Sequence, residues 1–120
     1  MKRNSIIILA LIFSLTSCVQ KSSKKTIIVR LNVESLKDGI QAVGIRGTEK
    51  PLSWDYDMEL KPIKKDTLYE ATFSLLTGYK FTEAKFIVNG QFELNDKPNR
   101  KIIFSEKDTT VYEAKFNVEK

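Results

Sequence analysis

The stretch Ala84-Lys85-Phe86-Ile87-Val88-Asn89-Gly90-Gln91-Phe92-Glu93 holds the strongest turn signal of the chain. Ala84, Phe86 and Val88 alternate with Lys85 and Ile87, which is the two-residue period of a strand. Asn-Gly between two such runs favours a type I′ turn, because that turn needs positive φ at both central residues. We therefore expect a strand over 82–88, a tight turn at 89–90 and a return strand over 92–94.

Short runs of the same kind lie on both sides of this hairpin. Upstream they cover 26–33, 40–46, 58–60 and 68–75, and downstream 102–104 and 109–118. In the last run the alternation of Val111, Ala114, Phe116 and Val118 slips once, which suggests a bulge. The segments 47–55 and 96–100 read as loops and 62–66 as a charged turn. Seven to eight short strands at about 10-residue spacing predict an all-β chain, a single immunoglobulin-like antiparallel β-sandwich over 26–120.

The first 18 residues carry a different pattern. Lys2 and Arg3 precede the apolar run from Ile6 to Phe13, and small residues lead to Cys18 in Leu15-Thr16-Ser17-Cys18. The pattern resembles a bacterial lipoprotein signal peptide with its lipobox. That resemblance implies cleavage before Cys18, a diacylglycerol on its sulfur and acylation of the new N-terminus. A transmembrane helix fits less well because it needs about 20 apolar residues. A soluble secretory signal ending at Ser17 is the other alternative.

The lipoprotein pattern divides the chain into a signal peptide over 1–17, a lipidated cysteine with a flexible tether over 18–25, and the sandwich over 26–120. It implies a bacterial cell envelope location, with a membrane attachment through Cys18. Val19 is not the aspartate that retains lipoproteins in the inner membrane, so the resemblance favours the outer membrane. The sequence leaves open whether the domain faces the periplasm or the cell surface.

Composition limits the chemistry of the 103 residues from Cys18 onward. The formal net charge of +5 includes Lys2 and Arg3, and the remaining lysines are spread along the chain, so nucleic acid is not an expected partner. Histidine is absent and Cys18 is the sole cysteine, which excludes the usual triads and a histidine zinc site. A hydrolase would have to use a carboxylate pair such as Asp55 and Asp57, but acidic residues are typical of solvated loops. The sequence thus predicts no enzyme, no cofactor and no metal site.

Two aromatic residues stand in polar surroundings. Trp54 lies in a proline-flanked loop, where an indole either closes one end of the core or meets a ligand. Phe92 follows the Asn-Gly turn among polar neighbours, where it either packs inward or lies at the surface.

Five motifs in order resemble carbohydrate-binding module families 20 and 48, which include the glycogen-binding domain of the AMP-activated kinase β subunit. They are Val43-Gly44-Ile45-Arg46-Gly47, Pro51-Leu52-Ser53-Trp54-Asp55, Leu68-Tyr69-Glu70-Ala71-Thr72-Phe73, the hairpin stretch 84–93 and Pro98-Asn99-Arg100. The resemblance runs from about Ile27 to Lys120.

This resemblance implies a site for α-1,4-linked glucose. Trp54 and Phe92 would stack on sugar faces, while Lys85 and Asn99 would bond sugar hydroxyls. A pyranose presents an apolar C–H face that an exposed ring covers at low entropic cost. The chain departs from the families in having Phe92 where tryptophan is usual, and in a longer stretch over 93–97.

The sequence as a whole predicts a non-catalytic, lipid-anchored protein that binds a polysaccharide, an α-glucan by resemblance. The alternative is an envelope protein that uses the same sandwich as a protein-interaction module, through an exposed edge strand or the loop of Trp54.

Overall fold

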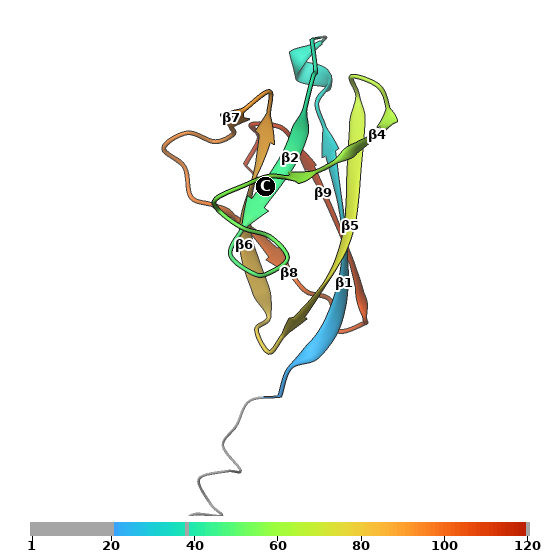
Figure 1. Cartoon of the computed structure of the whole chain (residues 1–120), viewed down its shortest axis with the longest axis vertical. Coiled ribbons are helices and arrows are strands. Elements are labelled where there is room, and N and C mark those ends of the chain that lie inside the picture. The colour runs from blue at the N-terminus through green and yellow to red at the C-terminus, as the bar shows by residue number, and fades with distance from the viewer. Residues whose placement is uncertain (1–20, 38, 120) are drawn as a thin grey trace, which may run out of the picture.

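The computed structural model describes residues 21–37 and 39–119, which form two stacked β-sheets (Figure 1). One short 3₁₀ helix, η1 (Glu34–Leu36), accompanies the strands. The strands are β1 (Ser23–Asn32), β2 (Val43–Gly47), β3 (Met58–Glu59), β4 (Lys61–Lys64), β5 (Leu68–Thr77), β6 (Phe81–Val88), β7 (Gln91–Phe92), β8 (Arg100–Ile103) and β9 (Thr109–Lys115). The prediction of an all-β sandwich is confirmed. In the described part of the chain no helix has the length and hydrophobicity needed to cross a membrane.

The two sheets differ in strand order. The four-stranded sheet runs β4-β5-β1-β9 and the five-stranded sheet runs β3-β2-β6, with β7 and β8 both paired to the other side of β6. Neighbouring strands are antiparallel except for β1 and β9, which run parallel with Ile27 opposite Thr110 and Leu31 opposite Ala114. The first and last strands thereby lie side by side in one sheet.

The core lies between the sheets because alternate residues of each strand point inward. β1 contributes Ile27, Val29 and Leu31, all fully buried, and β6 contributes Phe86 from the opposite sheet. Burying a side chain of this size contributes about 1.5–3 kcal/mol. These residues therefore fix which face of each sheet is left for other uses.

The hairpin between β6 and β7 has the predicted geometry. Asn89 and Gly90 have φ of 51° and 79°, and Val88 pairs with Gln91. The Asn89 side chain also ties down the preceding loop: its Oδ1 accepts hydrogen bonds from the backbone N–H of Gln41 (2.7 Å) and Ala42 (3.1 Å), and its Nδ2 donates to the carbonyl of Gly39 (2.8 Å). One residue thus supports both the turn and the approach to β2.

Several boundaries differ from those predicted. β1 begins at Ser23, inside the segment expected as a tether, because Ser23 to Lys25 pair with β5. β2 begins only at Val43. The predicted charged turn 62–66 is partly strand, since Lys61 and Pro62 pair with β5.

The last two strands differ as well. β7 ends at Phe92 because Glu93 turns inward and Leu94 adopts a φ of 53°. β9 keeps an unbroken register with β1, so the predicted bulge is wrong. Thr110 is buried in it, and Val111 is 49% exposed.

Candidate functional site

The outer face of the five-stranded sheet carries two of the four predicted site residues. Arg46 of β2 lies opposite Lys85 of β6, and Ile87 of β6 lies opposite Phe92 of β7. Their inward neighbours Ile45 and Phe86 are fully buried, so these four side chains point away from the core. Phe92 is 39% exposed, whereas Ile87 beside it is buried.

Trp54 belongs to the loop between β2 and β3, and its backbone carbonyl contacts Arg46 of the outer face. Leu52, which is 2% exposed, is the residue of this loop that fills the core, and the Trp54 side chain is 36% exposed. Trp54 Nε1 donates to Oγ1 of Thr48 at 3.1 Å, which holds the indole against its own loop. Gly47 permits this path, because a Cβ there would lie 2.7 Å from the Leu52 side chain and 2.7 Å from a backbone oxygen of Glu83.

Arg46 connects the Trp54 loop with Phe92. Its Nε donates to Oδ1 of Asp57 at 2.6 Å, one terminal nitrogen donates to the Trp54 carbonyl at 3.0 Å, and its Cζ lies 5.3 Å from the centre of the Phe92 ring. A guanidinium over an exposed ring contributes about 0.5–1 kcal/mol. Gly44 makes room for this arrangement, since Asp57 Cβ lies 2.8 Å from where a Gly44 Cβ would be.

Sequence reasoning quoted Arg46 within a motif and assigned it no role. The available signal was its position: an arginine at an outward register on a strand whose other residues are apolar or glycine. Asp57, considered at first as half of a carboxylate pair, is the partner of Arg46.

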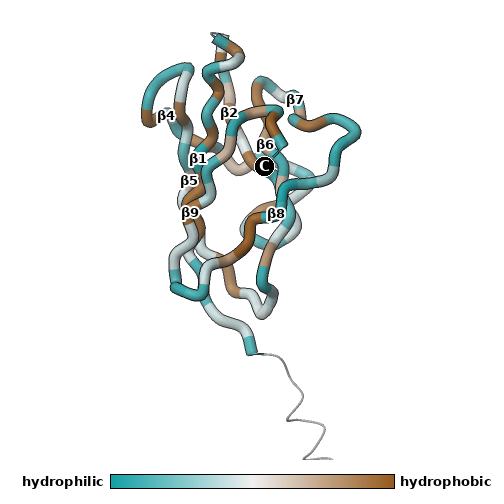
Figure 2. The backbone as a smooth tube through the Cα atoms, turned by 180° about the vertical axis from the view of Figure 1, so that it is seen from behind, coloured by the Kyte–Doolittle hydropathy of each residue, from teal (hydrophilic) through white to brown (hydrophobic). Residues whose placement is uncertain are grey.

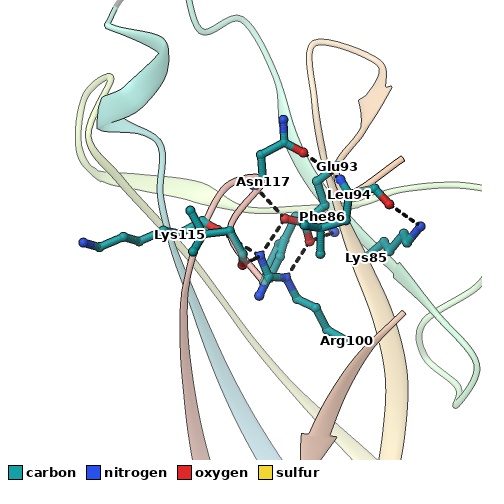
Figure 3. Close-up of polar contacts among 8 residues, drawn as sticks. Lys85, Phe86, Glu93, Leu94, Arg100, Lys115 and Asn117 are labelled. Carbon is teal, nitrogen blue, oxygen red and sulfur yellow. Dashed lines mark hydrogen bonds and ion pairs between the residues drawn. The ribbon is translucent and has the colours of Figure 1, made fainter. Parts of the chain in front are cut away.

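Lys85 lies between Arg46 and the segment that follows β7. Its Nζ donates to the carbonyl of Leu94 at 3.1 Å, and Figure 3 shows this bond on the side away from Arg100. An ammonium has three N–H donors, so Lys85 can keep this bond and donate to a ligand as well.

Asn99 belongs to the loop that joins β7 to β8, a largely hydrophilic segment (Figure 2). Its Nδ2 donates to Oε1 of Glu83 at 3.0 Å. Glu83 lies two residues before Lys85 on β6 and points to the same face. Asn99 therefore lies beside the outer face, one side chain away from the row of Lys85.

A buried ion pair between Glu93 and Arg100 joins the two ends of this loop. Glu93 and Arg100 side chains are 0% and 2% exposed and form two hydrogen bonds, of 2.6 and 2.7 Å. Glu93 also accepts from the backbone N–H of Phe86 and Asn117, and Arg100 donates to the carbonyls of Lys115 and Val118 (Figure 3). Burial lowers the pKa of Arg100, but the hydrogen bonds with Glu93 and Tyr112 outweigh it and raise the pKa.

The pair also explains the exposure of Phe92. Because adjacent strand residues point to opposite faces, an inward Glu93 leaves Phe92 facing outward. Sequence reasoning did not expect Glu93 inside, since an isolated carboxylate is costly to bury and only Arg100 and the backbone donors make it stable.

A groove lies on the far side of the Trp54 loop. It has a volume of about 920 Å³ and is lined by Trp54, by Pro51 and Tyr56 of the same loop, and by Ser74 to Leu76 of β5. Within residues 21–37 and 39–119, β4 pairs with β5 only as far as Glu70, so this part of β5 is a sheet edge beside the groove. The Trp54 loop thus borders both the outer face, through its backbone, and the groove, through the Trp54 side chain.

The described residues bear on a metal site but not on the predicted lipidation site. Among the described residues no group of three or more acidic, histidine or cysteine side chains is arranged to hold a metal ion. Cys18 lies outside the described residues, so its lipidation remains a prediction.

The chain matches no model of a known protein family, and no curated protein matches it. Among solved structures, one match is the solution structure of CBM25-2 of the beta/alpha-amylase from Paenibacillus polymyxa. The two chains are 14% identical, the match covers 78% of this chain and 84% of that one, and the TM-score is 0.43. A similarity at this level assigns neither a family nor a ligand to this chain.

Proposed function

We propose that this protein is a non-catalytic, lipid-anchored protein of the bacterial cell envelope that binds a carbohydrate. The single observation that carries the proposal is the contact of Arg46 with both the Trp54 loop and the Phe92 ring. The Arg46 guanidinium bonds the backbone carbonyl of Trp54 and lies over the Phe92 ring, and both aromatic side chains are partly exposed, so each offers a ring that a sugar can cover.

The surrounding side chains suit sugar hydroxyls. Lys85 and Asn99 supply N–H donors near Phe92, and Glu83 and Asp57 supply carboxylate acceptors. A shallow surface of this kind favours modest affinity, because little area is buried and the ordering of the sugar chain opposes binding.

An α-glucan is the ligand we propose. The support is the order of the five sequence motifs that resemble starch- and glycogen-binding modules, with Trp54, Lys85, Phe92 and Asn99 at the matching positions. The anchor is proposed at Cys18, in the outer membrane, on the lipobox pattern.

Affinity electrophoresis against starch, glycogen and unrelated glucans tests the proposal. Trp54→Ala and Phe92→Ala should each weaken retardation by about 2 kcal/mol, or about thirtyfold in Kd, because each removes one stacking surface. Tyr79→Ala is the matched control, since Tyr79 is also an exposed aromatic but lies outside the site. Equal retardation of all four proteins, or none for the unaltered chain, would refute glucan binding.

Arg46→Lys tests the connection between the two rings. Lysine keeps the charge but cannot form the planar fork. We expect about fivefold weaker binding, equivalent to about 1 kcal/mol. Trp54 is the sole tryptophan, so its emission should shift in this variant even without a sugar. An unchanged emission spectrum and unchanged affinity would show that Arg46 does not position the site.

The groove beside Trp54 supports one alternative, a protein-interaction module. An extended segment of a partner could pair with this edge of β5 and cover Tyr56 and Leu76. Crosslinking in cells that yields a protein partner, together with no retention on any glucan, would favour this alternative.

A further inference from the structure

One end of the sandwich, here named the tether end, gathers three segments. They are the start of β1 (Ser23–Lys25), the turn between β5 and β6 (77–80) and the loop between β8 and β9 (104–108). Ser23 pairs with Thr77, and the Thr26 N–H donates to the carbonyl of Asp108 at 2.8 Å. The Phe104 N–H donates to the carbonyl of Lys80 at 2.9 Å. Figure 1 shows the three segments together at the end where the chain enters the sandwich.

Large apolar side chains are exposed around this end. Phe81 of β6 and Ile103 of β8 lie opposite each other on one sheet and are 40% and 68% exposed. Tyr79 in the turn is 67% exposed, and Leu76, near the end of β5 on the other sheet, is 70% exposed. Tyr79 and Phe81 also line a cavity of about 480 Å³ with Lys80. We call these exposed side chains, Leu76, Tyr79, Phe81 and Ile103, the apolar rim of the tether end.

Lysines accompany the apolar rim. Lys21, Lys24, Lys80 and Lys107 are exposed at the tether end, and the acidic residues there include Glu106 and Asp108. Glu49 adds a further carboxylate, whose Oε1 accepts from Thr77 Oγ1 at 3.5 Å. Lys25 is fixed across the end, because its Nζ donates to the carbonyls of Ser105 and Lys107, both at 3.1 Å. Lys101 places its Nζ 5.0 Å from the centre of the Phe81 ring. Aromatic rings next to lysines are the side chains that favour the boundary between lipid headgroups and acyl chains.

The distance to the proposed anchor is short. Four residues lie between Cys18 and Ser23. The five steps from one to the other span at most about 3.6 Å each, or about 18 Å in all. β1 alone, with its 10 residues, is about 33 Å long. The start of β1 therefore lies within about 18 Å of the proposed anchor, a distance shorter than β1 itself.

We infer that the tether end is a membrane-contact surface, on which Tyr79, Phe81 and Ile103 meet the acyl-chain boundary of an anionic bilayer while the lysines bind its headgroups. The inference rests on the lipid anchor of the proposed function. The occupant is a bilayer because the short tether holds this end at the membrane and because its charge is complementary to acidic lipids. In this orientation the outer face of the five-stranded sheet, with Trp54 and Phe92, stands beside the membrane and stays open to a glycan.

The test measures how close two matched positions come to lipid. The chain from Cys18 onward is coupled through its sole thiol to a maleimide lipid, in a Trp54→Phe background, and placed in phosphatidylcholine–phosphatidylglycerol vesicles with brominated acyl chains. Tyr79→Trp and Ile63→Trp are compared, because both side chains are exposed, 67% and 56%, and only Tyr79 lies at the tether end. Ile63 lies on β4, which pairs with Leu68 to Glu70 of β5 beside the far end of β1. Bromine quenches an indole only at short range. Emission of the Tyr79→Trp protein should fall at least about twofold and shift to the blue, and that of the Ile63→Trp protein should not.

The outcome separates this inference from the function it rests on. Equal quenching at the two positions, or none at Tyr79→Trp, would overturn the membrane contact and point to a protein or a second copy on this rim. Chemical coupling replaces natural acylation, so the result does not depend on whether Cys18 is acylated in the cell, which mass spectrometry of the purified chain tests separately. Glucan binding is measured without vesicles and stands or falls independently.

A charge-reversal variant tests the role of the lysines separately. Lys24→Glu with Lys80→Glu, both exposed positions, should weaken headgroup binding about fivefold per charge removed and more on reversal. Quenching at Tyr79→Trp should then approach the Ile63→Trp level in anionic vesicles, with circular dichroism confirming the fold. Undiminished quenching would overturn the role given to these lysines.

Discussion

At the scale of single residues, the fold contains a buried ion pair that the hydropathy pattern of the sequence does not indicate. Glu93 and Arg100 are seven residues apart and join the end of β7, the start of β8 and the C-terminal carbonyls in one buried network. Each oxygen of Glu93 has a donor, which is the condition under which a buried carboxylate is tolerated.

Replacing Glu93 by glutamine should destabilise the protein by about 3–5 kcal/mol, because Arg100 would be left buried without a countercharge. Urea unfolding followed by circular dichroism measures the change. Glu106→Gln is the control, since Glu106 is exposed and its loss should change stability by less than about 0.5 kcal/mol. A similar small effect for both variants would contradict the assigned role of the pair.

The candidate site shows what residue-level reasoning can and cannot find. The sequence context of Trp54 and Phe92 left open whether each ring packs inward or faces outward, and the family resemblance implied exposed rings; both side chains are partly exposed. Arg46 was missed because its partners, Asp57 and the Trp54 carbonyl, come from a loop whose path is set by Leu52 and not by any local pattern. Long-range partners of this kind leave no periodic signal in a sequence.

At the scale of elements, turn chemistry was more informative than hydropathy. Asn89-Gly90 specified its turn through backbone conformation, and the alternation in β5 and β6 specified their buried faces. The segment 62–66 was read as a charged turn because of its lysines and Pro62. Lys61 to Lys64 instead form the edge strand β4, on which all four residues are exposed. β9 was given a bulge because Val111 was assumed to face inward, whereas the parallel register with β1 turns it outward.

Asn89→Ala should lower stability by about 1–3 kcal/mol. The change removes an αL-tolerant residue from the turn and leaves the N–H groups of Gln41 and Ala42 and the Gly39 carbonyl without their side-chain partner. Thermal unfolding beside Asn95→Ala, an exposed asparagine in the next loop, measures the difference. Equal melting temperatures for the two variants would show that the loop over 39–42 holds itself.

At the scale of the whole molecule, the sheets are closed by segments from opposite ends of the chain. β9 lies against β1, and the residues just beyond β9 cover the Glu93–Arg100 pair: Phe116 is 7% exposed and Asn117 donates to Glu93. The pairing of β1 with β9 joins residues far apart in the sequence, and no local sequence feature indicates it. The number of predicted strands therefore indicated the class of fold but not the order of its strands.

A chain that ends at Lys115 should lose at least about 3 kcal/mol, because a buried phenylalanine and two partners of the ion pair are removed together. A chain that begins at Ser23 is the control, since Lys21 and Ser22 are exposed and lie outside β1. Denaturant midpoints of the two truncated chains measure the difference. Comparable midpoints would mean that the C-terminal residues contribute nothing to closure.

The shared direction of β1 and β9 has a practical consequence for engineering. Strands that run the same way deliver the chain from one pole of the domain to the other, so a cargo fused behind residue 119 would emerge opposite the point of attachment. Because β1 is about 33 Å long, that cargo would lie roughly that far from the point of attachment. With a donor fluorophore fused there and an acceptor dye in the bilayer, a low transfer efficiency would indicate that the tether end faces the membrane and the fused cargo lies away from it.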